Sequence, residues 1–193
     1  PSKGYEYLTR ITYNPTREIA IYGQFREESK AENPSADEQD NPVRTPMQGI
    51  KRNYLIGVIF PANERLIFKS RVQWSSFDFN DQRTEGYAIW QDMILDFDKL
   101  RFFGRIALFD TDNFDNAQYA FENDVLYAFS VPAYNGIGTR QYIVIQYKPL
   151  NKLTLWAKFA RTNFRDQEVI SSGLDTIEGS KRSDIRLQVR INF

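Results

Sequence analysis

The chain of 193 residues contains no histidine and no cysteine. Their absence excludes disulfides, thiolate nucleophiles, imidazole bases and the usual zinc sites, which need those side chains. Most catalytic constellations are therefore missing, and we expect a protein that is not an enzyme and that carries no cofactor. Lysine plus arginine and aspartate plus glutamate number 25 each, so no net charge favours nucleic acid as a partner.

Long apolar runs are also absent. The longest spans 54–60, far short of the roughly 20 residues of a membrane helix. Aromatic residues are abundant instead, with 15 Phe, 11 Tyr and 3 Trp. A membrane protein without an apolar helix must be a closed β-barrel, because only helices and barrels satisfy their backbone hydrogen bonds in lipid. Such barrels carry aromatic girdles, which this composition suits.

The last stretch of the sequence, 183–193, alternates apolar and polar residues without interruption. A period of two predicts a strand, and its length fits the roughly 9–11 residues with which a tilted strand crosses a bilayer. An alternating strand that ends on an aromatic residue is similar to the closing strand of bacterial outer-membrane barrels and to the signal read by the barrel-assembly machinery. We expect that signal to comprise the apolar members Ile185, Leu187, Val189, Ile191 and Phe193. The last strand of a soluble β-sandwich or barrel would also alternate.

The same alternation predicts nine strands, at 5–13, 19–26, 52–60, 66–74, 87–96, 100–108, 138–148, 153–160 and 183–193. Short turns at 14–17, 61–64, 97–99 and 149–152 alternate with long loops at 27–47, 75–86, 110–137 and 164–182. All short turns then lie at one end of the sheet, like the periplasmic turns of outer-membrane barrels, and the long loops are extracellular. The predicted fold is an all-β, antiparallel transmembrane β-barrel of outer-membrane type, forming one domain over residues 1–193 in the bacterial outer membrane.

Strand direction bears on the stretch 110–137. A strand inside it would place the turn at 149–152 on the extracellular side, so we expect one long loop whose aromatic residues fold back over or into the lumen. The first and the last of the nine strands then both run inward. Because bacterial single-chain barrels have even strand numbers, we expect this chain to supply about nine or ten carboxy-terminal strands of a larger barrel.

Three stretches carry a resemblance to a known family: 109–115, 119–134 and 171–184. They resemble the tail of a Bacteroidetes group whose members carry periplasmic helix-hairpin-helix segments ahead of an outer-membrane barrel. The resemblance covers essentially the whole chain and is most specific in the loops. It implies a Gram-negative outer-membrane location and a longer precursor, and it transfers no catalytic residue. The helix-hairpin-helix segment is not in this sequence, so nucleic-acid binding is not expected.

Charged residues gather on the strand face opposite the apolar one. An Arg or Lys on a lipid face costs about 2–4 kcal/mol at the bilayer midplane, so this face must line the lumen. The predicted lumen residues are Arg10, Lys69, Arg71, Asp92, Asp96, Arg101, Arg105, Lys158, Arg186 and Arg190. They either form a pore that selects solutes or form a mutually neutralising network that plugs a small barrel. The interspersed signs favour the plug, as do Trp90, Phe103 and Trp156 on the same face.

Two acidic groups invite a chemical interpretation. Asp110, Asp112, Asn113 and Asp115 offer hard oxygen ligands for Ca²⁺, but the glycine and the distal glutamate of an EF-hand are missing, so we expect an ordinary loop and no metal. Asp92 and Asp96 share a strand face like a catalytic carboxylate pair. Nearby arginines are expected to keep both ionised, which does not suit acid–base catalysis.

Two functions remain ahead of a third, an enzyme such as an outer-membrane lipase or protease, which the absence of histidine disfavours. The first is an outer-membrane barrel that acts as a porin-like channel or as the membrane subunit of a complex. Its partners would be the lipid bilayer, lipopolysaccharide, the barrel-assembly machinery and other outer-membrane subunits. The second is a soluble β-barrel or sandwich that binds an apolar ligand inside. In the first case Leu187 and Val189 face outward while Arg186 and Arg190 face inward; the second reverses these directions.

Overall fold

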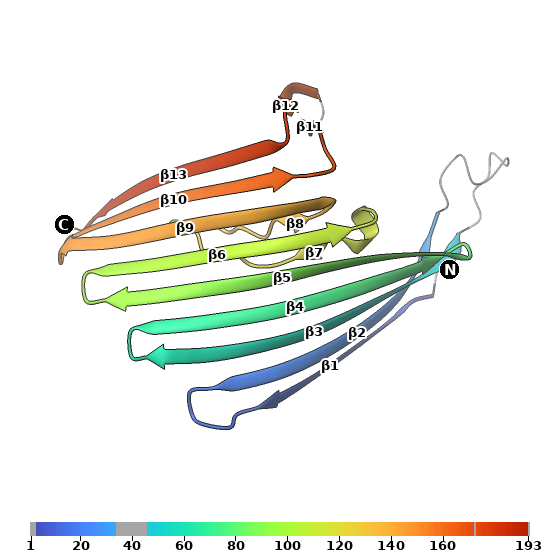
Figure 1. Cartoon of the computed structure of the whole chain (residues 1–193), viewed down its shortest axis with the longest axis horizontal. Helices are drawn as coiled ribbons and strands as arrows, with labels where there is room; N and C mark the ends of the chain where they lie inside the picture. Colours follow the sequence, from blue (N-terminus) through green and yellow to red (C-terminus); the bar gives the residue numbers. More distant parts are fainter. Residues whose placement is uncertain (1–2, 34–45, 172, 193) are drawn as a thin grey trace.

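A computed structural model of the chain describes residues 3–33, 46–171 and 173–192. One antiparallel sheet of nine strands dominates it (Figure 1). The strands follow chain order across the sheet, so each pairs with its predecessor and no connection crosses over. They are β1 (Tyr5–Tyr13), β2 (Ala20–Glu32), β3 (Met47–Asn63), β4 (Leu66–Phe79), β5 (Gln82–Phe97), β6 (Leu100–Thr111), β9 (Ile137–Leu150), β10 (Leu153–Phe164) and β13 (Lys181–Ile191). The all-β class and the nine predicted strands are confirmed.

The connections contain only short elements. Between β6 and β9 lie the 3-10 turn η2 (Phe114–Asn116) and a small hairpin of β7 (Gln118–Tyr119) and β8 (Ala133–Tyr134). Between β10 and β13 lie β11 (Val169–Ile170), η3 (Gly173–Asp175) and β12 (Ile177–Glu178). No α-helix occurs in the described ranges, and none of their helical turns is long and apolar enough to cross a membrane.

One predicted long loop is wrong. The stretch 75–86 is mostly strand, because β4 continues to Phe79 and β5 begins at Gln82. Only Asn80 and Asp81 form the turn, and both have positive φ angles, 50° and 58°. Two consecutive residues with positive φ are the mark of a type I′ hairpin turn, whose twist matches that of the flanking strands. Asparagine and aspartate tolerate this conformation better than other non-glycine residues.

The other predicted long loops fit better. The segments 112–136 and 165–180 do connect sheet strands, whereas the predicted loop 27–47 is too long at both ends. There β2 continues to Glu32 and β3 begins at Met47, and residues 34–45 lie outside the described ranges. The tight connections 14–19, 64–65, 98–99 and 151–152 all lie at one end of the sheet, on the left in Figure 1.

Neighbouring strands are offset in a regular way. The register leads from Tyr13, the last residue of β1, across all nine strands to Ser183 in β13. Strand β13 continues for eight further residues beyond Ser183, to Ile191. The tight-turn end of the sheet therefore shifts by about one residue per strand. A stagger of this kind is what inclines the strands of a barrel to its axis.

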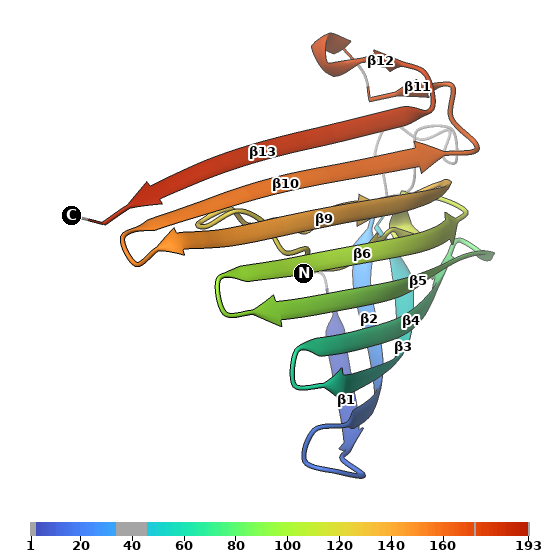
Figure 2. The ribbon, with the colours of Figure 1, turned by 60° about the vertical axis from the view of Figure 1, so that its left-hand side comes forward.

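The sheet is curved and open. Figures 1 and 2 together show that β1–β3 curl behind the plane of β5–β13 and that the segment 112–136 lies on the same, concave side. No closed barrel forms within the described residues, because β1 and β13 each pair with one neighbour. Eight reversals of direction separate β1 from β13, so these two edges are parallel. They cannot pair with each other in an antiparallel sheet.

Candidate functional site

The concave face of the sheet carries the polar half of the alternation. All ten predicted lumen residues lie on it, as the register requires: Arg71 pairs with Trp90, Lys69 with Asp92, and Lys158 with Arg186. The apolar residues of β13 lie on the opposite, convex face and are exposed, with Leu187 at 77 % and Val189 at 62 % of full accessibility. Phe193 of the predicted assembly signal lies outside the described residues.

Several of these charges form ion pairs within the sheet. Arg105 is buried and donates to both carboxylate oxygens of Asp92, with Nη2 to Oδ2 at 2.8 Å. Arg101 pairs with Asp96. The two aspartates are thus bound to arginine, as expected. Lys69 and Arg190 make no salt bridge to any described residue.

The segment 112–136 covers the concave face of β5, β6, β9 and β10, and its main contact is a buried carboxylate that the sequence did not single out. The side chain of Glu122 is 0 % exposed. Arg140 donates two hydrogen bonds to this carboxylate, from Nε to Oε1 at 2.7 Å and from Nη2 to Oε2 at 2.9 Å. The Tyr134 hydroxyl donates to Oε1 at 2.8 Å, and Lys158 Nζ lies 3.5 Å from Oε2. The buried charge is therefore fully partnered, as burial requires.

A second carboxylate extends this ionic cluster. The side chain of Asp124 is also 0 % exposed, and it accepts from Lys158 Nζ at 2.8 Å and from Arg186 Nη1 at 2.7 Å. Arg105, besides binding Asp92, donates from Nη1 to the backbone carbonyl of Phe121 at 2.8 Å. The ionic cluster of Glu122, Asp124, Arg140, Lys158 and Arg186 thus joins the segment to three strands of the sheet.

Burial and pairing act in opposite directions on these carboxylates. Burial on its own would raise the pKa of Glu122, but the hydrogen bonds and charge of Arg140 outweigh it and lower that pKa below its ordinary value. Burial likewise opposes the effect of Lys158 on Asp124, whose pKa is also lowered. Burial, with the charge of Glu122, raises the pKa of the Tyr134 phenol. Both carboxylates are therefore ionised at neutral pH, and the phenol is a neutral donor.

Apolar and neutral contacts complete the attachment. Tyr134 packs edge-on against Trp90 and Phe109, with ring centroids 5.6 Å apart in both pairs. Gln118 is completely buried and donates from Nε2 to Ser75 Oγ at 2.6 Å. The stretch 110–137 folds back over the concave face of the sheet, while its place in a lumen stays a prediction. Of the aromatic residues that led to this expectation only Tyr134 is buried, and Tyr119, Phe121, Tyr127 and Phe129 are exposed. The carboxylates that anchor the segment could be found only through contacts distant in sequence.

A groove remains beside the attached segment. It has a volume of about 400 Å³ and lies between the concave face of β1–β4 and the residues Ala117 and Tyr119 of the segment. Its charged lining residues are Arg10, Arg26, Glu28, Lys51 and Arg71. The uncharged polar ones are Tyr22, Gln24, Asn53 and Gln73. Two of the predicted lumen residues, Arg10 and Arg71, thus lie in this groove, while Arg105, Lys158 and Arg186 lie under the segment.

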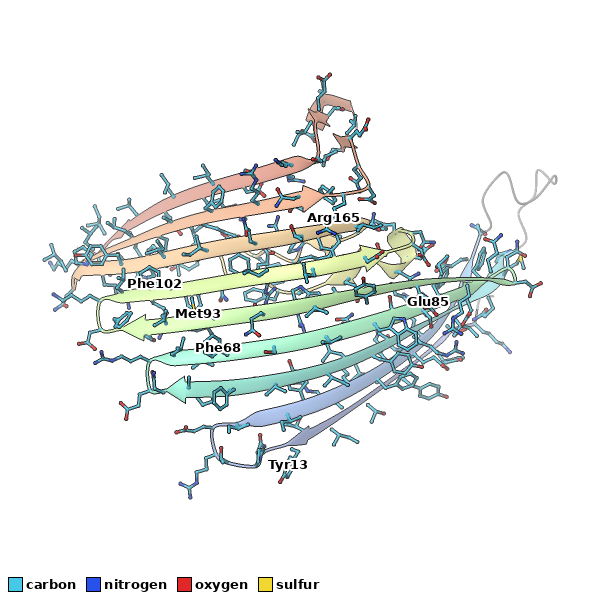
Figure 3. All side chains as sticks on the ribbon, viewed as in Figure 1. Tyr13, Phe68, Glu85, Met93, Phe102 and Arg165 are labelled. Atoms are coloured by element: carbon cyan, nitrogen blue, oxygen red, sulfur yellow. The ribbon has the colours of Figure 1, made fainter. Side chains whose placement is uncertain are left out.

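The convex face is apolar over most of its area. Phe68 and Met93 pair across β4 and β5, and Phe102 lies on β6 beside them (Figure 3). A row of aromatic residues crosses four adjacent strands toward the other end, with Tyr54 and Trp74 stacked at 5.4 Å between ring centroids. The row consists of Phe25, Tyr54, Trp74 and Tyr87.

Beyond this aromatic row the same convex face becomes ionic. Arg52 binds Glu27 at 2.7 Å and Asp78 at 2.6 Å, and Arg83 lies 3.1 Å from Glu85. The convex face therefore changes from apolar to charged across a single line of aromatic side chains.

Comparison of the chain with protein-family models, curated proteins and solved structures finds no match. The described residues contain no group of three or more acidic side chains placed to hold a metal ion.

Proposed function

We propose that this chain forms part of the wall of a bacterial outer-membrane β-barrel, and that the segment 112–136 narrows its lumen to a path for small polar solutes. The observation that carries the proposal is the distribution of polarity. The covered, concave face holds the charges, whereas the bare, convex face holds exposed apolar side chains such as Ile11, Ile56 and Leu187. A water-soluble sheet protein would show the opposite distribution, with its charges on the bare face and its apolar side chains on the covered one.

The shape of the apolar band, the apolar part of the convex face, supports a location in a membrane. At the tight-turn end of the sheet the edge of this band shifts by eight residues between Tyr13 in β1 and Ile191 in β13, over eight strand-to-strand steps. With a rise of about 3.3 Å per residue and a spacing of about 4.8 Å between strands, this band is level when the strands tilt by about 35°. Transmembrane barrels have tilts of about 35–45°. The line of aromatic residues followed by ion pairs also suits a lipid–water interface, where aromatic girdles lie.

The open edges support a larger assembly. Because β1 and β13 are parallel, an odd number of further strands must stand between them to close an antiparallel barrel. These strands come from elsewhere in the polypeptide or from a partner subunit. The resemblance of the loops to the Bacteroidetes helix-hairpin-helix group agrees with such an arrangement.

The test uses an environment-sensitive label on single cysteines, which the chain accepts without interference because it has no other cysteine. In protein reconstituted in bilayers, a label at Val189→Cys should be quenched by a lipid-borne quencher. A label at Arg190→Cys, one residue further on the other face, should be quenched much less. Equal protection of both labels would overturn the membrane proposal and favour a soluble β-protein that binds an apolar ligand.

A further inference from the structure

Three cations in the groove beside the segment 112–136 lack an acidic partner. The Arg10 guanidinium lies over the ring of Tyr22 at 4.1 Å, and that of Arg71 over the ring of Trp90 at 4.3 Å. Lys51 Nζ donates to the backbone carbonyl of Asp115. None of the three forms a salt bridge with a carboxylate in the part of the chain that the structure describes.

The negative charge in the groove is already engaged. Glu28 binds Arg26 at 2.9 Å and also pairs with Lys30. Arg26 in turn binds Glu6 at 2.8 Å. Among the residues that line the groove, the remaining charge is that of Arg10, Lys51 and Arg71; the carboxylates of Asp115 and Glu32 lie near Lys51 without a salt bridge to it and offset part of its charge.

A guanidinium stacked on an aromatic ring keeps its N–H donors at its edge, where they can bind carboxylate or phosphate oxygens. The side-chain amides of Gln24, Asn53 and Gln73 add uncharged donors to the same lining. We infer that this groove is the solute path of the barrel and that it favours small anions, carboxylates or phosphates, over cations. The inference rests on the proposed function and adds the class of solute to it. Lipid headgroups are not the ligand in view, because the groove lies on the face opposite the apolar band.

The test is the reversal potential of the closed barrel, in which the full polypeptide or the partner subunit supplies the missing strands, in planar bilayers under a gradient of potassium chloride at concentrations near about 0.01 M, where screening is weak. We expect chloride to permeate more readily than potassium. A unit charge about 8 Å from a permeating ion in water changes its local concentration about twofold. Each removed cation should therefore lower the chloride-to-potassium permeability ratio about fourfold, since it disfavours the anion and favours the cation.

Three variants apply this test. Arg71→Gln and Arg10→Gln each remove one groove charge together with a contact to an aromatic ring. Lys51→Gln removes a charge that stacks on no ring in the described residues, so it separates charge from packing. Lys152→Gln, in the tight turn between β9 and β10, is the matched control and should leave the ratio unchanged.

The outcomes are distinct. A cation-selective wild type, or a ratio that none of the three groove variants lowers, would overturn the inference while a conducting channel still supports the proposed function. Lipid quenching at Val189 without any conductance would leave the barrel standing and overturn the solute path. Absence of both would overturn the membrane proposal itself.

Discussion

Replacing Glu122 by glutamine removes the charge that holds the segment 112–136 on the sheet while keeping nearly the same shape. The substitution leaves Arg140 and Lys158 buried without their shared carboxylate. Removing one partner of a buried ion pair costs about 3–5 kcal/mol. Because Asp124 still binds Lys158 at 2.8 Å, we expect the lower end of that range. A loss of about 3 kcal/mol corresponds to about a 100-fold higher population of the detached segment.

Amide hydrogen exchange measures this population directly. The Asn123 amide donates to the Tyr142 hydroxyl of β9 at 3.2 Å, and the Gly136 amide donates to the Thr111 hydroxyl of β6 at 2.8 Å, so both bonds join the segment to the sheet. We expect both amides to exchange about 100-fold faster in Glu122→Gln, while amides in the middle of β5 keep their protection. Glu168→Gln is the matched control, since Glu168 is an exposed acid in another connection of the sheet. Unchanged exchange at these two amides in Glu122→Gln would refute the argument that the carboxylate anchors the segment.

Three further predictions concern the carboxylates that anchor the segment, the contact of η2 with β5, and the convex face. Because the pKa values of Glu122 and Asp124 are lowered in the folded state, their contribution is complete at neutral pH and is lost as the pH falls below about 4, so the protection factors of the segment's amides, which correct for the intrinsic pH dependence of exchange, should fall below that pH and stay constant between pH 6 and 8. Gly86→Ala should displace η2 and lower the free energy of unfolding by about 1–3 kcal/mol, because its Cβ would lie 2.8 Å from the Asn116 carbonyl oxygen. In the control Gly104→Ala the nearest atom is 3.9 Å away, so thermal unfolding should be unchanged. Leu187→Lys, next to the middle of β13, should lower the free energy of unfolding in lipid by about 2–4 kcal/mol, and Ser183→Lys, two residues from the end of β13 on the same face, by about 0–1 kcal/mol; equal costs at both depths in urea titrations would contradict a membrane around β13.

The sheet could be predicted from the sequence because alternation is a local property. The residues of each strand alternate between apolar and polar within the strand itself, and the tight turns mark where the chain reverses direction, so all nine strands could be predicted. The errors lie at the other end of the sheet. Ser75, Ser76 and Asp78 look like loop residues, and Phe77 and Phe79 lie on the face opposite to Trp74, so the apolar residues change face within β4. The Asn80–Asp81 pair is the local signal of a two-residue turn. The change of face interrupted the pattern that located the rest of the strand.

The candidate site was less accessible to sequence reasoning. The alternation predicted the polar face, but Arg140 was not among the predicted lumen residues although it lies on the same face. Glu122 and Asp124 have no local signal, since their basic partners lie 18 to 62 residues further along the chain. The aromatic residues in the stretch 110–137 predicted that it would fold back over or into the lumen, but of those five only Tyr134 packs on the sheet as a buried residue. Which of its acids would meet which base depended on the register of strands that are distant in sequence.

The position of the segment 112–136 also explains why the cations on one side of the concave face are paired with carboxylates and those on the other side are not. Its two buried carboxylates neutralise cations of β9, β10 and β13, and the sheet's own Asp92 neutralises Arg105 on β6. The segment reaches β1–β4 mainly through uncharged atoms, such as the Asp115 carbonyl that accepts from Lys51. A network that only plugged the lumen would have no reason to leave Arg10 and Arg71 without carboxylates at the edge of the covered region. The segment therefore covers one side of the concave face with its two buried carboxylates and leaves Arg10 and Arg71 on the other side without a salt bridge to a described residue.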